Sequence, residues 1–337
     1  MSADVTAPPT MRSFDEGRGR QFGRAIFMAA PVFVVLFALF VWITIENPNF
    51  TNPPVFLIFL RRAAPLMILA AGQLFVIISG EFDLSMGALI TLVVILAGDW
   101  IDGDPSMTWP IIAVLLLIGV AVGLANGVIT TRLGVPSFIT TLGMMLILSG
   151  FALWWSGGTP KGSLPDNFRQ WGRTGIQDVP WITQLPWSVI IMWIVMIACV
   201  YLLHFTSFGK QVYATGGNPR AAFFSGVNVP RVRTLCFVIS SVTAVIAGIL
   251  LGGFAGVSPD AGGGLEFQAI SAVVLGGAVL GGGSGMVIPA MAGALTLEAL
   301  FTLLNLLGLP SPLRSVFQGV IIIGALGIAA FRDRKTR

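Results

Sequence analysis

Charged residues are scarce in this chain of 337 residues: only 10% are Asp, Glu, Lys or Arg, whereas 55% are hydrophobic. The mean hydropathy is +0.89. A chain of this composition has too few polar residues to cover a water-facing surface, which excludes an ordinary soluble domain. We therefore expect membrane lipid to contact much of its surface. Backbone groups in a bilayer need internal partners, and the apolar runs exceed the ~9–11 residues of a barrel strand. We therefore predict an all-α polytopic membrane protein.

Cysteine, histidine and nucleotide-binding motifs are also nearly absent. Cys199 and Cys236 fall inside apolar runs without CxxC spacing, so we interpret them as small buried apolar residues. The only histidine, His204, lies at the end of a run. The P-loop pattern G-x-x-x-x-G-K-[ST] does not occur, and GGTPKGS (157–163) lacks the lysine after its last glycine. We expect no metal, cofactor or nucleic acid to bind this chain.

Ten apolar runs predict ten membrane spans, near 25–45, 63–79, 84–98, 110–131, 137–155, 187–204, 234–254, 265–280, 286–305 and 313–331. Thirteen of the 19 Lys and Arg residues fall on the side of the termini, which predicts that side to be cytoplasmic. The tails would be 1–24 and 332–337, the transmembrane domain 25–331, the main inner loop 205–233 and the longest outer loop 156–186.

Two spans are interrupted by glycine-rich strings, GEFDLSMG (80–87) and LGGGSGMV (280–287). Broken helices at membrane depth commonly surround a pathway, although close packing through small residues explains a single glycine equally well. A faint repeat, LGVPSFI (133–139) against LGLPSPL (307–313), falls on opposite predicted faces. It indicates a possible inverted repeat.

The polar segment 208–233 predicts a short helix built for a soluble partner. Phe208 and Gly209 would close the preceding span, and Gly216, Gly217, Asn218 and Pro219 would form a turn in which Asn218 caps the helix. The helix would run from Arg220 through Ala221 and Ala222 to Ser225 and end at Gly226. So short a helix suits a groove on another protein, and an amphipathic helix resting on the membrane is the alternative.

Four segments resemble the permeases of bacterial ABC importers of the ribose and monosaccharide type. They are ISGEFDLSMGALITL (78–92), GVPSFITTLGMMLILSG (134–150), FGKQVYATGGNPRAAFFSGVNVPRVR (208–233) and LEFQAISAVVLGGAVLGGGSGMV (265–287), in the family's order and spacing. The chain departs from the family at Glu81-Phe82, where a Gly-Ile-type pair is usual. The resemblance implies an inner-membrane permease that imports a monosaccharide or related polyol.

The resemblance also implies partners. The short helix would be the coupling helix that docks on a separate ABC ATPase subunit, and that subunit would bind the ATP and Mg. A second permease subunit and an extracytoplasmic substrate-binding protein would complete the importer.

Polar residues within or beside the spans are the candidates for lining a pathway, since sugar hydroxyls need neutral donors and acceptors. They are Gln73, Asp83, Ser85, Asn126, Thr140, Thr141, Gln268, Glu298 and Asn305. Most could equally hold helices together. Asp83 could cap the next span through the Ser85 and Gly87 amides, and Glu81 is expected to be solvated at the inner surface. Glu298 would be a pathway or an interface residue.

Two other classes of protein remain open at this point. An ion-coupled secondary transporter would use Asp83, Glu81 and Glu298 as proton sites. An intramembrane protease could use Ser284 of GGSG (282–285), but no histidine follows that serine in the chain, so a tight turn is the better interpretation.

Overall fold

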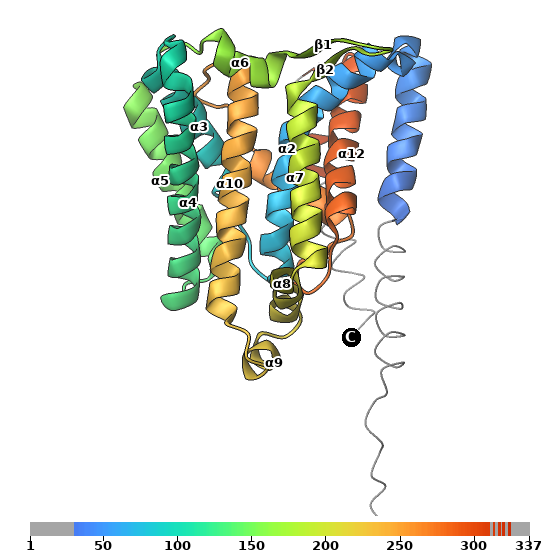
Figure 1. Cartoon of the computed structure of the whole chain (residues 1–337). Helices are drawn as coiled ribbons and strands as arrows, with labels where there is room; N and C mark the ends of the chain where they lie inside the picture. The colour runs from blue at the N-terminus through green and yellow to red at the C-terminus, as the bar shows by residue number, and fades with distance from the viewer. Residues whose placement is uncertain (1–29, 311–312, 314–315, 318, 321–322, 325–337) are drawn as a thin grey trace, which may run out of the picture.

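In the computed structural model, residues 30–310, 313, 316–317, 319–320 and 323–324 are described. Long helices run side by side between two ends of the molecule (Figure 1). One end carries α6 (Asp166–Arg173) and an antiparallel hairpin of β1 (Gly175–Val179) and β2 (Thr183–Pro186), and we call it the hairpin end. The other end carries α9 (Pro219–Phe224), and we call it the α9 end.

The described helices confirm the all-α membrane class. Six are long and apolar enough to cross a bilayer: Pro53–Ile78 (α2), Pro105–Arg132 (α4 with the 3-10 turn before it), Ser137–Ser156 (α5), Trp187–Phe205 (α7 with a π-helical turn), Val229–Ala255 (α10) and Val287–Leu306 (α12). Three apolar helices are shorter, Ala30–Glu46, Met86–Ile101 (α3) and Leu265–Leu275 (α11). The predicted span 313–331 falls largely outside the described residues.

The span predicted at 265–280 is wrong in form, because α11 has only 11 residues. At 1.5 Å per residue it is about 16 Å long, roughly half of a ~30 Å hydrocarbon core. The chain enters α11 through the non-helical segment 256–264 and leaves it through the glycine-rich segment 276–286. In the same way, α3 is preceded by the non-helical segment 79–85, which we call the first break. The predicted interruptions by GEFDLSMG and LGGGSGMV are therefore present, whereas the second of the two spans that they adjoin is a partial helix.

The two breaks meet inside the bundle. A Cβ on Gly87, in the first turn of α3, would overlap the Glu266 carboxylate at the start of α11, and one on Gly262 would overlap the Gly87 carbonyl oxygen. The Gly262 N–H also donates to Thr91 Oγ1 of α3 over 3.0 Å. The beginnings of α3 and α11 thus pack against each other through glycine, and the two helices lead away to opposite ends.

The directions of the helices agree with an inverted repeat. Gly119, Gly123 and Gly127 place α4 antiparallel to α10, since they approach Val245, Val238 and Thr234 in turn. LGVPS after α4 therefore lies at the α9 end. Because Glu298 of α12 lies beside Arg62 of α2, LGLP (307–310) after α12 lies at the hairpin end. Each half consists of a long helix, a break, a shorter helix and another long helix, as inverted repeats in transporters do.

The polar loops contain more structure than the sequence predicted. The outer loop 156–186 folds into α6 and the hairpin, so the chain is not purely helical. The segment after Phe205 forms α8 (Ser207–Gly217). Phe208 and Gly209 therefore lie in the first turn of α8 and do not close the preceding span. Cys199 and Cys236 are both buried, as predicted.

Candidate coupling and translocation site

The short helix α9 forms the tip of the α9 end (Figure 1). Phe223 and Phe224 are 65% and 86% exposed, and their rings pack edge to face with centroids 5.8 Å apart. Asn218 caps the helix as predicted, because its side-chain oxygen accepts from the Ala221 N–H over 3.0 Å. Pro219 occupies the first turn, and Gly226 follows the helix with φ +84°. These local features present a rigid pair of exposed aromatic rings at one tip of the molecule.

The residues predicted to contact a partner divide into two groups. Gly217, Asn218, Pro219, Arg220, Ala221, Ser225 and Gly226 are exposed. Ala222 is only 4% exposed, so it packs within the chain and is not available to a partner. Gly216 is half-buried at the end of α8. Phe223 and Phe224 were not among the predicted coupling residues, although two adjacent aromatic residues in an otherwise polar loop favour contact with a partner.

Helix α8 connects this tip to the ends of several other elements. A Cβ on Gly216 would overlap the carbonyl oxygen of Ile78, the last residue of α2, and Ile78 also accepts from the Gly283 N–H over 2.8 Å. The Tyr213 hydroxyl donates to the Gly285 carbonyl over 2.6 Å. Burial raises the pKa of Tyr213, which keeps its phenol protonated as that donor. The ends of α2, α8 and the segment 276–286 are thus held together.

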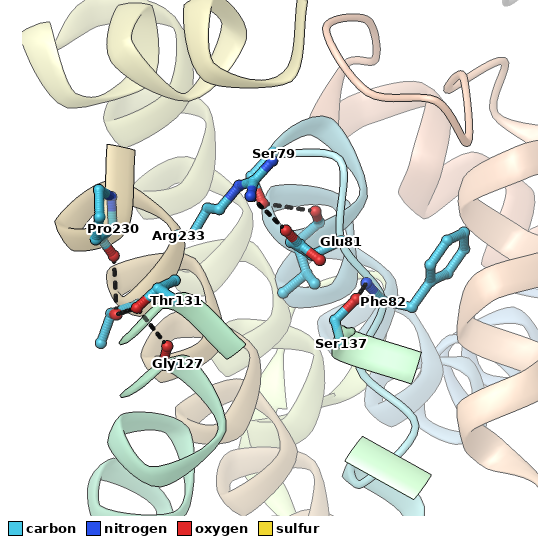
Figure 2. Close-up of polar contacts among 10 residues, drawn as sticks. Ser79, Glu81, Phe82, Gly127, Thr131, Ser137, Pro230 and Arg233 are labelled. Carbon is cyan, nitrogen blue, oxygen red and sulfur yellow. Dashed lines mark hydrogen bonds and ion pairs between the residues drawn. The ribbon is translucent and has the colours of Figure 1, made fainter. Parts of the chain in front are cut away.

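An ion pair links the first break to α10 in the same region (Figure 2). Arg233 Nη1 lies 2.8 Å from Glu81 Oε1. Glu81 is 8% exposed, so the expectation that it is merely solvated is wrong. The next residue of the break, Phe82, donates its N–H to Ser137 Oγ at the start of α5 over 3.1 Å. The break is therefore attached on one side to the helix that follows α9 and on the other to α5.

Asp83 is the centre of a buried network within the break. Its Oδ1 accepts from the Ser85 N–H over 2.9 Å and from the Ser85 hydroxyl over 2.6 Å, and its Oδ2 accepts from the Ser240 hydroxyl over 2.6 Å. Asn126 Nδ2 donates to Ser85 Oγ over 2.9 Å. The predicted contact with the Ser85 amide is present, and Ser240 takes the place predicted for Gly87. Since Asp83 is 0% exposed, its carboxylate ties the break to α4 and α10.

Of the remaining pathway candidates, Thr141 reaches the first break. Its Oγ1 lies 2.8 Å from the Ser137 carbonyl oxygen and 3.4 Å from the carbonyl oxygen of Phe82. The side chains of Gln73 and Thr140 are buried without a hydrogen-bond partner among the described residues. Asn305 is exposed, and within the described part of the chain its side-chain amide donates to the Phe301 carbonyl of its own helix. Gln268 and Glu298 share a cavity near the hairpin end. The predicted residues therefore fall into three groups: those in the buried hydrogen-bond network at the first break, those that line the cavity, and those that lie apart from both.

The fold and these sites define a polytopic membrane protein of the permease class. A family model described as the permease component of the branched-chain amino acid transport system matches residues 55–326. The ribose import permease protein of Bacillus subtilis (strain 168) is 36% identical over 312 residues, covering 90% of this chain and 92% of that protein. Its Escherichia coli (strain K12) counterpart is 34% identical over 315 residues, covering 91% and 95%.

The autoinducer 2 import system permease protein of Salmonella typhi is 32% identical over 301 residues, covering 88% of this chain and 84% of that protein. No solved structure gives a significant match. The chain belongs to the family of ABC importer permeases that includes these ribose permeases, and it is a multi-pass protein of the inner membrane.

Proposed function

We propose that this chain forms the translocation pathway of an ATP-driven importer for a monosaccharide or related polyol. The cargo class is supported by the relatives named for ribose and by the neutral polar side chains near the bundle interior. In this proposal the chain itself breaks no covalent bond. ATP and Mg would be bound by a separate ABC ATPase subunit.

The exposed aromatic pair of α9 carries the proposal. Two large apolar side chains at 65% and 86% exposure on a six-residue helix have no stabilising role of their own, whereas they suit a groove on a soluble partner. The α9 end would then be cytoplasmic, with both termini on the same side. The hairpin end would face outward, toward an extracytoplasmic substrate-binding protein, and a second permease subunit would complete the membrane assembly.

The contacts behind α9 support a route for coupling. α9 is followed after four residues by α10, whose first turns carry Arg233. Arg233 holds Glu81 of the first break, and Phe82 of that break is bonded to α5. A partner that moves α9 would therefore pull directly on the break and on the start of α5. Alternating access would follow from ATP binding and hydrolysis in the partner.

The test is whether an ATPase subunit requires the aromatic pair. The tagged chain is purified from its native membranes, and accompanying subunits are identified by mass spectrometry and assayed for ATPase activity. Phe224→Glu is expected to abolish co-purification and uptake, because a carboxylate cannot enter an apolar groove without a large desolvation cost. Gln211→Glu, an exposed position on α8, is the matched control and should retain both.

Co-purification and uptake that survive Phe224→Glu would contradict the assignment of α9. Uptake by the chain without an ATPase, driven by a proton gradient and lost in Asp83→Asn, would instead establish the ion-coupled secondary transporter. The three hydrogen bonds to Asp83 argue against that alternative, because they give this side chain a structural role in holding the first break to α10.

A further inference from the structure

A cavity of about 200 Å³ lies near the hairpin end, directly beside the start of the short helix α11. Its walls come from α2, α6, α7, α10, α11 and α12. Leu265, the first residue of α11, and Gln268, one turn later, form part of the lining. Because α11 spans only about half of a bilayer, the cavity is a consequence of the partial helix.

The lining holds polar groups whose bonding capacity is unused. Ser188 of α7 is 1% exposed, and its hydroxyl has no partner among the described residues. The side-chain amide of Gln268, which is half-buried, has no hydrogen bond within the described part of the chain. Arg62 Nη2 and Glu298 Oε1 are 3.7 Å apart, a long ion pair that leaves other donors and acceptors of both groups available. Ser188 is the buried member of the set, whereas the Arg62 side chain is 46% exposed. A buried hydroxyl is normally paired, so Ser188 needs a partner that the described residues do not supply, and the other groups are placed to bind the same ligand.

The chemistry of the set selects the kind of partner. Ser188 and Arg62 can donate, Glu298 accepts, and Gln268 does both. An alcohol hydroxyl also donates and accepts, so vicinal hydroxyls satisfy such a mixture. Arg61 lines the cavity beside Arg62, so an anion would meet two guanidinium groups as well as the Glu298 carboxylate, and inorganic phosphate is therefore the comparison that decides between the two kinds of ligand. Leu250, Leu251 and Phe254 supply an apolar wall for the C–H face of a sugar ring. The volume lies below the ~300–1,000 Å³ of drug-sized pockets, which limits the ligand to about the size of a monosaccharide.

We propose that this cavity is a low-affinity binding site for a neutral polyhydroxylated solute within the permease itself. The proposal rests on the proposed function, since it places a contact for the cargo between the hairpin end and the first break. The site would hold a solute after it enters from the hairpin end. Toward the α9 end, the Glu81–Arg233 ion pair, with 2.8 Å between Oε1 and Nη1, holds the first break against α10.

The test measures binding to the purified permease with its ATPase subunits in lipid nanodiscs, without a binding protein. The probes are D-ribose, D-glucose, D-galactose and myo-inositol at up to tens of millimolar, with inorganic phosphate as the anionic comparison, and the readouts are saturation-transfer NMR and thermal stability. We expect saturable binding of at least one polyol and none of phosphate. Gln268→Leu should weaken that binding about tenfold, the loss of one or two hydrogen bonds.

Asn305→Leu is the matched control, because among the described residues the amide it removes from α12 bonds to its own helix alone. It should leave binding unchanged. If Gln268→Leu does not fold, Ser188→Ala tests the same cavity with a smaller change and should weaken binding several-fold. Absence of saturable polyol binding, binding of phosphate in its place, or indifference to both cavity variants would overturn the proposal.

Failure of this proposal is distinguishable from failure of the proposed function. If ATP-dependent uptake persists while no polyol binds the cavity, the site is wrong and the importer stands. If no ATPase subunit accompanies the chain, the importer is wrong whatever the cavity binds.

Discussion

Removing the Glu81–Arg233 ion pair should uncouple the permease more than it unfolds it. Glu81→Gln and Arg233→Gln each leave one charge without its partner at the junction of the first break and α10. Because α10 follows α9 after a short turn, the pair joins the helix that continues from α9 directly to the first break. ATPase activity in the complex should persist in both variants, while uptake per ATP hydrolysed falls severalfold.

The magnitude follows from the geometry of the pair. Two unit charges 2.8 Å apart attract by about 6 kcal/mol at an effective dielectric constant of ~20. The side chains are 23% and 11% exposed, so the pair is intermediate between exposed pairs worth ~0–1 kcal/mol and buried pairs whose disruption costs ~3–5 kcal/mol. We expect a coupling free energy of about 2 kcal/mol in a double-mutant cycle.

The assay compares the two single variants with the double variant Glu81→Gln/Arg233→Gln and with the charge-exchange variant Glu81→Arg/Arg233→Glu. Thermal stability in detergent gives the coupling, and uptake per ATP gives the functional effect. Arg231→Gln is the matched control, since Arg231 is exposed and has no ion pair among the described residues. Strictly additive single effects, or an equal loss of uptake in Arg231→Gln, would refute the reasoning.

Three further predictions concern packing and the buried network. Gly216→Ala should abolish folded permease, because the added Cβ would overlap the Ile78 carbonyl oxygen. Gly217→Ala places its Cβ in open space and should be nearly neutral. The yield of folded protein of each variant is measured by size-exclusion chromatography. Ser240→Ala should destabilise by about 1–3 kcal/mol, since it removes a donor from buried Asp83, and an unchanged melting temperature would mean that the bond is unimportant. Cys199 and Cys236 should resist maleimide labelling in native membranes and react only after denaturation, because both are buried; rapid labelling of native protein would contradict the packing.

The sequence predicted those features that have local causes. Long apolar runs identified the spans, and Asn218, Pro219 and Gly226 identified the bounds of α9 to within a residue because caps act over one turn. The first break was visible as a glycine-interrupted string. The opposite placement of LGVP (133–136) and LGLP (307–310) was also correct for the described residues, since it follows from counting crossings.

Features that depend on distant contacts were not predictable from the chain alone. Ser240 and Arg233 join the first break only after α10 packs beside α2, and neither has a local signal at its position. Glu81 was assigned to water because its partner lies more than a hundred residues away. Ala222 appeared available to a partner because only tertiary packing reveals which side of a one-turn helix is covered. The true length of α11 was hidden by the apolar glycine-rich residues that follow it.

The partial helix α11 also constrains how the chain enters the membrane. Eleven residues flanked by glycine-rich segments are too short to be stable across a bilayer alone, since their neighbouring backbone groups would be unsatisfied in lipid. Two of those groups find their partners in the first half of the chain: the Gly262 N–H donates to Thr91 Oγ1 of α3, and the Gly283 N–H donates to the Ile78 carbonyl at the end of α2. The second half of the chain therefore depends on the first for its insertion, and synthesis of the two halves as separate polypeptides should yield a membrane-integrated second half only when the first is co-expressed.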